Sequence, residues 1–107
     1  MGKLISGATE IEFDDRALVH LRSVIGSKLR RGESFALSWN DPVASGGARS
    51  SLWLHPNMPL YFTFTGSETP RLNRAWLDVL TTSADSRFGL LLSAEPLGQD
   101  AAQNHTD

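Results

Sequence analysis

Residues 10–13 alternate between polar and hydrophobic side chains. Ile11 and Phe13 alternate with Glu10 and Glu12, and a period of two is typical of a strand with one buried face. Residues 3–6 are predicted to form a preceding strand. The intervening Gly7-Ala8-Thr9 suits a tight turn, so the two strands are expected to pair as a hairpin.

From Asp14 the spacing of hydrophobic residues changes to three and four, which places them on one stripe of a helix. The residues of this stripe are Leu18, Leu21, Ile25 and Leu29. Asp14 is a suitable N-cap, and Gly32 is the expected stop. The pattern therefore predicts a helix between Asp14 and Gly32.

The rest of the chain is predicted to form three strands, a second helix and a last strand. Strands are predicted at 35–40, 50–55 and 60–65, with a loop at 41–49 and a turn at 56–59. Thr69 is the expected cap of a second helix that has Pro70 at its first position. The predicted apolar stripe of that helix is Leu72, Ala75, Trp76, Val79 and Leu80. A last strand is predicted at 88–93.

These elements predict an α+β domain with two layers and the order β-β-α-β-β-β-α-β. We expect a mainly antiparallel sheet with both helices on one face. The domain is expected to occupy residues 1–95. Residues 96–107 are polar and aperiodic, which is typical of a disordered tail, and this tail is acidic.

The face of the sheet that the helices leave uncovered follows from the alternation of side chains. It is expected to carry Trp53, His55 and Tyr61 on neighbouring strands. Two exposed aromatic rings and a histidine predict a surface that binds a partner, because Trp and Tyr are favoured anchors of interfaces. The alternatives are a platform that stacks a base or a sugar, and a solvated face on which Trp53 and Tyr61 pack on each other.

Length and composition then exclude several classes of protein to which the chain could belong. A chain of 107 residues is long enough for one domain. The absence of Cys excludes disulfides, thiolate metal sites and a Cys nucleophile. The net charge of −2 argues against a dedicated nucleic-acid binder, which usually has a basic domain. No apolar run has the length of a signal sequence or a membrane span, so we expect a cytoplasmic protein without a membrane partner.

Motifs for enzymatic chemistry are absent from the sequence. There is neither a Walker A motif nor a Gly-x-Ser-x-Gly elbow. His20, His55 and His105 lack the spacing of a zinc-binding pair, and His20 is expected to be solvated on the first helix. We therefore expect no catalytic residue, no metal and no cofactor.

Basic residues gather at the end of the first predicted helix, at Lys28, Arg30 and Arg31. Cations at this position complement the helix dipole. The same residues are the candidate phosphate-binding site of the chain, to which Arg16 and Arg22 would add. Both interpretations are open at this point.

Two stretches of sequence carry a family resemblance. The first is Ile-Glu-Phe-Asp-Asp-Arg at 11–16, continued by Val-Ile-Gly-Ser-Lys-Leu-Arg-Arg-Gly-Glu-Ser-Phe at 24–35. The second is Leu-Trp-Leu-His-Pro at 52–56 with Leu-Asn-Arg-Ala-Trp at 72–76. Over residues 1–95 the chain resembles a family of short, uncharacterised actinobacterial proteins of about this length, whose members often carry the automatic label "ATP-dependent DNA ligase".

The residues do not supply the chemistry that this label names. Such a ligase carries the adenylate on a lysine in a Lys-x-Asp-Gly motif. The two lysines here, Lys3 and Lys28, are followed by other residues. We therefore expect a non-enzymatic module that forms a homo-oligomer or binds a protein partner. The alternative is a nucleic-acid accessory protein that uses the basic end of the first helix, with stacking from Trp53 and Tyr61.

Overall fold

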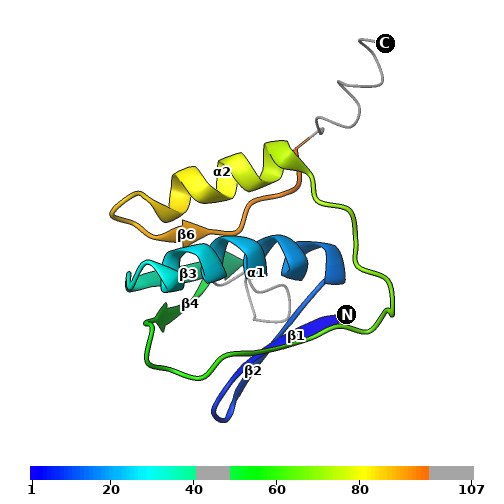
Figure 1. Cartoon of the computed structure of the whole chain (residues 1–107), viewed down its shortest axis with the longest axis horizontal. Coiled ribbons are helices and arrows are strands. Elements are labelled where there is room, and N and C mark those ends of the chain that lie inside the picture. Colours follow the sequence, from blue (N-terminus) through cyan, green and yellow to red (C-terminus); the bar gives the residue numbers. More distant parts are fainter. Residues whose placement is uncertain (41–48, 97–107) are drawn as a thin grey trace.

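The computed structural model describes residues 1–40 and 49–96 (Figure 1). The strands are β1 (Gly2–Ser6), β2 (Thr9–Phe13), β3 (Phe35–Asn40), β4 (Arg49–Leu54), β5 (Tyr61–Thr63) and β6 (Leu90–Leu91). The helices are α1 (Asp15–Arg30), between β2 and β3, and α2 (Arg74–Ala84), between β5 and β6. These elements confirm the predicted α+β class and the predicted order.

The strands form two sheets of three strands each, where the sequence predicted a single sheet. The first sheet has the order β2-β1-β5 and the second has the order β4-β3-β6. All pairs are antiparallel except β3 with β6. Most of the pairing is therefore antiparallel, as predicted.

The division of the sheet arises at the connection between β4 and β5. Met58 donates its N–H to the carbonyl oxygen of His55 at 3.3 Å, and Pro56 and Pro59 in this turn have no N–H for a ladder. The chain then pairs with the free edge of β1, where Leu4 lies opposite Phe62. The expectation that Trp53 and Tyr61 lie on neighbouring strands is therefore wrong, because β4 and β5 belong to different sheets.

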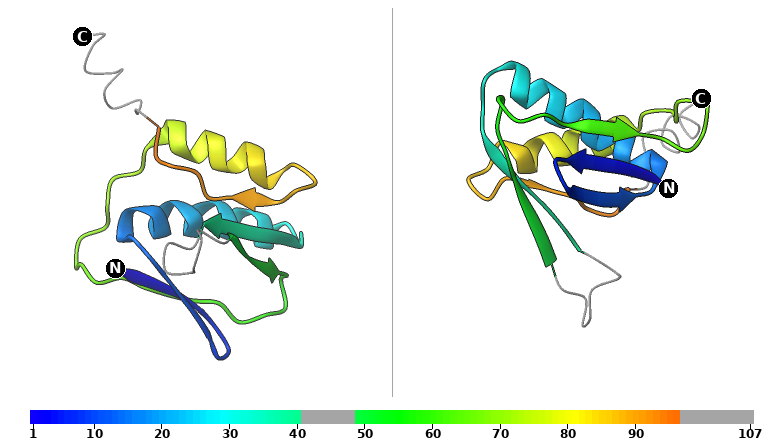
Figure 2. Two further views of the ribbon diagram at one scale, coloured as in Figure 1. Left: turned by 180° about the vertical axis from the view of Figure 1, so that it is seen from behind. Right: turned by 90° about the horizontal axis from the view of Figure 1, so that it is seen from below.

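Helix α1 is the central element of the core. It lies between α2 and the first sheet, with the second sheet behind it (Figures 1 and 2). Eight of its 16 residues are buried, because it is covered on three sides. Leu18, Leu21 and Ile25 of the predicted stripe are almost completely buried. Burial of each such side chain contributes about 1.5–3 kcal/mol relative to exposure.

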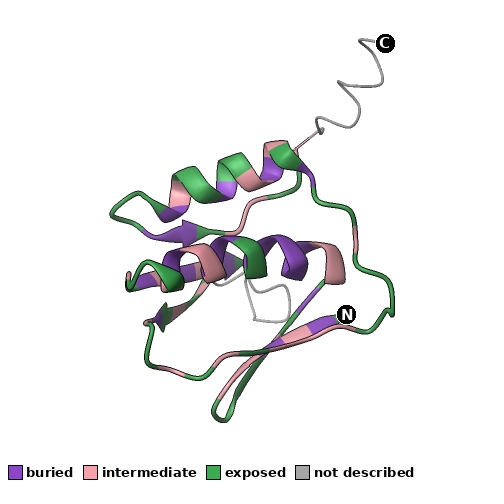
Figure 3. Cartoon of the chain, in the orientation of Figure 1, coloured by how far each residue is buried: buried purple, intermediate pink, exposed green. Residues whose placement is uncertain are grey.

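The N-terminal hairpin agrees with the alternation in the sequence. β1 and β2 pair over their full lengths, and the turn between them uses Gly7 at φ +60°. Phe13 is buried whereas Glu10 and Glu12 are exposed (Figure 3). Lys3 donates to Glu10 at 3.2 Å across the hairpin. The outer carboxylates of β2 thus lie on a solvated surface.

The ends of α1 lie where the sequence placed them, with Asp14 at the N-cap position and Gly32 at φ +78° after the helix. The Asp14 side chain makes no capping hydrogen bond. Instead, the Asp15 carboxylate accepts hydrogen bonds from Thr65 N (3.2 Å), Thr65 Oγ1 (3.0 Å) and Gly66 N (3.0 Å). These bonds, that of Gly66 first, lower the pKa of Asp15 and tie α1 to the segment after β5.

Helix α2 begins later than predicted. Its N-cap is Asn73, whose side-chain oxygen accepts from Ala75 N at 3.0 Å and Trp76 N at 3.3 Å. The expected start at Thr69 and Pro70 is wrong, because Asn73 can cap the helix and also contact α1. Of the predicted stripe, Trp76 and Leu80 are buried. Leu72 and Val79 are exposed.

The last predicted strand is shorter than expected, since only Leu90 and Leu91 pair with β3. Phe88 lies before the strand and is exposed. The predicted loop at 41–49 falls, up to residue 48, outside the described residues. The tail is likewise outside from residue 97 on.

Candidate functional site

The second sheet has one face that neither helix covers, visible in the left view of Figure 2. On β3 the buried residues are Phe35, Leu37 and Trp39, so the alternate residues face outward. Ala36 lies opposite Trp53, and Ser38 lies opposite both Ser51 and Leu91. We call this outward surface, formed by Ala36, Ser38, Ser51, Trp53, Leu91 and the adjacent Phe88, the open face.

Small and large side chains are segregated on the open face. Ala36 and Ser38 lie on the central strand β3, Ser51 lies beside Ser38 on β4, and the hydroxyls of the two serines lie 2.7 Å apart. The large side chains are exposed, by 63% for Trp53 and 76% for Phe88. Trp53, Phe88 and Ala36 are among the residues that line a cleft of about 190 Å³. The prediction that Trp53 is exposed is thus confirmed, whereas the exposed ring of Phe88 beside it was not predicted.

Phe88 is presented by a turn that serine side chains hold in place. Ser86 Oγ donates to Ser83 O at 2.7 Å and accepts from Phe88 N at 3.3 Å. Ser83 Oγ accepts from Leu91 N at 3.1 Å. The Arg87 guanidinium lies 5.1 Å from the centre of the Phe88 ring. These bonds fix the backbone that carries the Phe88 ring, so this part of the chain has less conformational freedom to lose on binding.

The other two residues predicted on this surface lie elsewhere. His55 follows β4, and its Nδ1 accepts from Asn57 N at 3.3 Å inside the turn. Tyr61 is 64% exposed but belongs to β5, where it lies opposite Ile5 in the first sheet. The structure therefore does not bring Tyr61 together with Trp53.

The predicted basic cluster is divided between two environments. Lys28 is buried, and its Nζ lies 2.6 Å from Glu33 Oε1 and 3.1 Å from Asp85 Oδ1. The hydrogen bond to Glu33, more than that to Asp85, raises the pKa of Lys28 against the opposing effect of burial. Arg31 also contacts Glu33, at 3.1 Å. Arg30, in contrast, is exposed and lines a separate hollow with Arg22.

His20 is completely buried, so the expectation of a solvated histidine is wrong. Its Nε2 accepts from Asn73 N at 2.7 Å, and its Nδ1 lies 2.6 Å from Arg16 O. Because Nε2 accepts, Nδ1 carries the proton and donates to that carbonyl. The ring lies 4.6 Å from the Trp76 ring, centre to centre. His20 therefore joins α1 to the start of α2.

Asn73 and Arg16 extend this junction to the C-terminal segment. Arg16 Nε and Nη2 donate to the two Glu95 oxygens at 2.7 and 2.6 Å, and Nη1 donates to Arg71 O at 2.7 Å. Asn73 Nδ2 donates to Glu95 Oε2 at 2.8 Å. The hydrogen bonds from Arg16 and then Asn73 lower the pKa of Glu95 to about 2. We call these four residues, His20, Asn73, Arg16 and Glu95, the junction.

This lowered pKa predicts a specific acid sensitivity. A carboxyl group whose pKa is lower in the folded protein contributes stability above its unfolded pKa, and this contribution is lost as the pH falls toward the folded value. For Glu95 the window runs from the ordinary value of 4.5 down to about 2. We expect urea unfolding midpoints to fall across this window in the natural protein and to fall less steeply in Glu95→Gln. Equal pH profiles for the two proteins would contradict the role of Glu95.

Comparisons with known proteins place the chain in a family. A family model described as "Domain of unknown function (DUF7882)" matches residues 1–95, so the chain belongs to this family. No curated protein and no solved structure matches the chain. In the described ranges, no helix has the length and apolar character needed to cross a membrane. Within the same ranges no group of three or more metal-ligating side chains occurs.

Proposed function

We propose that this member of the DUF7882 family is a protein-association module that dimerises through the open face. The observation that carries the proposal is the exposure of Trp53 and Phe88 on a sheet face without a covering helix. The opposite face of this sheet already buries Phe35, Leu37 and Trp39 in the core, so the two exposed rings are not needed for the fold of one chain. Aromatic rings are enriched at interface centres relative to ordinary surface. A second layer supplied by another chain would cover both rings.

The partner of this surface is proposed to be a second copy of the chain. In a two-fold interface the same patch contacts itself, so it must carry both projections and the hollows that receive them. The open face has both: Trp53 and Phe88 are exposed, whereas Ala36, Ser38 and Ser51 are small residues on the adjacent strands β3 and β4. A two-fold rotation can place the rings of one copy over the small residues of the other.

Sedimentation equilibrium of the natural chain and of Trp53→Ala/Phe88→Ala tests the proposal. The natural chain is expected to dimerise between micromolar and millimolar concentration. The double variant is expected to dissociate at least about 100-fold more readily, because truncation of a central aromatic residue commonly costs 2 kcal/mol or more. Both side chains are exposed, so circular dichroism and urea unfolding should show an intact fold.

Tyr61→Ala is the matched control, because Tyr61 is as exposed as Trp53 but lies in the first sheet. It should leave the dimer unchanged. A natural chain that remains monomeric throughout would overturn dimerisation. A dimer that is weakened by Tyr61→Ala and unaffected by the double variant would place the interface on the first sheet and refute the open face.

The ligase label of the resembling proteins is not part of this proposal. Both lysines of the chain contact carboxylates, since Lys3 Nζ lies 3.2 Å from Glu10 and Lys28 Nζ lies 2.6 Å from Glu33. A nucleophilic lysine needs a depressed pKa or a neighbouring base, whereas the pKa of Lys28 is raised. The accessory role on nucleic acid stays a prediction, and it loses support from Lys28 and Arg31 because both cations are neutralised locally.

A further inference from the structure

A groove runs along the exposed side of α1. It consists of two adjoining hollows of about 170 and 300 Å³ that share the lining residues Val19, Arg22 and Thr69. In Figure 1 the exposed side of α1 faces the viewer, whereas the open face of the second sheet lies behind the molecule. The groove is therefore separate from the proposed dimer interface.

Two arginines supply positive charge to this groove. Arg22 lines both hollows and Arg30 lines the larger one. Neither takes part in an ion pair with any residue in the described part of the chain. The Arg22 guanidinium lies 5.5 Å from the centre of the Phe64 ring, and this contact restricts its position. The charges of Arg22 and Arg30 are thus available to a ligand.

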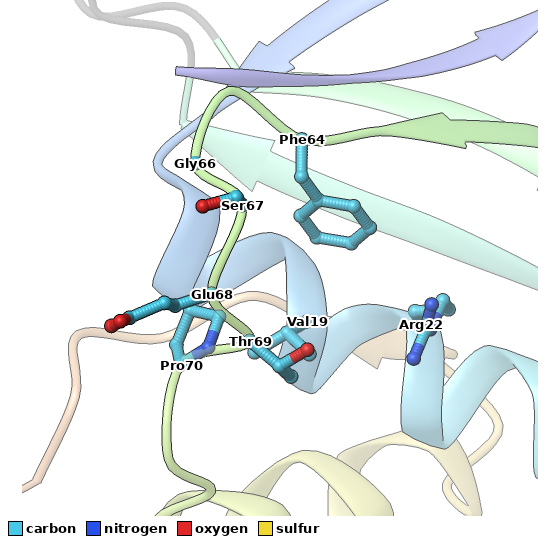
Figure 4. Close-up of a pocket in the computed structure, with 8 residues that line it drawn as sticks. All are labelled: Val19, Arg22, Phe64, Gly66, Ser67, Glu68, Thr69 and Pro70. Atoms are coloured by element: carbon cyan, nitrogen blue, oxygen red, sulfur yellow. The ribbon is translucent and has the colours of Figure 1, made fainter.

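The remaining walls combine hydroxyls with apolar surface. Figure 4 shows the Phe64 ring pointing into the smaller hollow above Val19, with Pro70 on the far side of Thr69. Leu72 lines the larger hollow and is 44% exposed. The residues that bring hydroxyl groups to the groove are Ser23, Ser67 and Thr69. A ligand of this groove needs an anionic group together with an apolar body.

Glu68 is the one acidic residue among those that line the groove in the described structure. Figure 4 shows its carboxylate turned to the side away from Arg22 and Phe64. Asp15, close to Gly66, has its carboxylate engaged by the backbone and hydroxyl donors of Thr65 and Gly66. The centre of the groove therefore keeps its positive charge.

We propose that the groove between Arg22 and Arg30 binds a phosphate monoester of a small aromatic or aliphatic alcohol. Two guanidinium groups match the nearly double negative charge of a phosphate monoester better than the single charge of a carboxylate. The hydroxyl groups of Ser23 and Thr69 can donate hydrogen bonds to a further phosphate oxygen. The apolar substituent of the ester would lie against Phe64, Val19 and Leu72, away from water.

NMR titration of the full chain with phenyl phosphate tests this inference. Saturable shifts are expected for the backbone amides of Val19 and Thr69. Inorganic phosphate, which lacks the apolar body, and benzoate, which lacks the second charge, should each bind at least about tenfold more weakly. Arg22→Gln and Arg30→Gln should each weaken the binding of phenyl phosphate about tenfold or more, whereas Arg49→Gln, an equal charge change on β4, should not.

Each contrary result refutes a defined part of the inference. Equal affinity for inorganic phosphate would exclude a role for the apolar walls. Equal affinity for benzoate would exclude selection for the phosphate charge. An equal effect of Arg49→Gln would show that only the overall charge matters. An absence of saturable shifts in the natural chain, with α1 intact by circular dichroism, would overturn the site.

Discussion

His20→Ala should lower the free energy of unfolding by about 3–5 kcal/mol, a large part of the 5–15 kcal/mol typical of a domain. The substitution removes a completely buried ring that lies against Trp76. It also leaves the N–H of Asn73 without its acceptor at 2.7 Å. The buried donor without a partner and the new cavity each lower the free energy of unfolding.

Urea unfolding at pH 7 measures this loss. His55→Ala is the control, because His55 is half-buried and its ring accepts a hydrogen bond from Asn57 N within its own turn. That variant should lose no more than about 1 kcal/mol. A loss below 1 kcal/mol for His20→Ala would show that α1 and α2 stay docked without the histidine, and the junction would then have no structural role.

The helix α1 could be predicted from sequence because local signals agree there. Asp14, the stripe that begins at Leu18, and Gly32 all indicate the same element, and the structure confirms its ends. The start of α2 depends instead on a contact from another helix. Thr69-Pro70 and Asn73 are both good starting signals, and only Asn73 also reaches His20 of α1.

The same distinction explains His20 itself. Arg22 lies two residues further along a polar stretch, so the local pattern favoured a solvated ring. Its burial results from Asn73 and Trp76 at the start of α2, which lie more than fifty positions further along the chain. An amphipathic pattern indicates a helix that is covered on one side. Because α1 is covered on three sides, the pattern could not indicate that His20 is buried.

For the candidate site, too, the local sequence pattern predicted which side chains face outward but not which elements lie next to each other. Alternation along β4 correctly predicted that Trp53 faces outward. It could not predict which strand lies next to β4, and so it paired Trp53 with Tyr61. Phe88 was assigned to the last strand, although Gly89 at φ +85° breaks the extended backbone there and the strand begins only at Leu90. The glycine was the available signal, because a glycine inside a strand pattern often marks a break.

Gly89→Ala should lower the free energy of unfolding by at least about 3 kcal/mol, through two separate effects. The residue has a φ of +85°, which strains any side chain. A Cβ atom there would lie 2.5 Å from the carbonyl oxygen and 3.1 Å from the nitrogen of Ala36. Both atoms belong to the backbone of β3, so neither can rotate away.

Gly32→Ala separates the two effects, because Gly32 has a similar φ of +78° and no atom within 4 Å of the position of its Cβ. It should lose about 1 kcal/mol from strain alone. The difference between the variants in urea unfolding therefore measures the close approach of the α2–β6 turn to β3. Since Phe88 directly precedes Gly89, Gly89→Ala should also displace that ring and weaken the proposed dimer, whereas Gly32→Ala should not. Equal losses of stability for the two variants would show that β3 yields to the added methyl group, and that backbone conformation alone requires glycine at position 89.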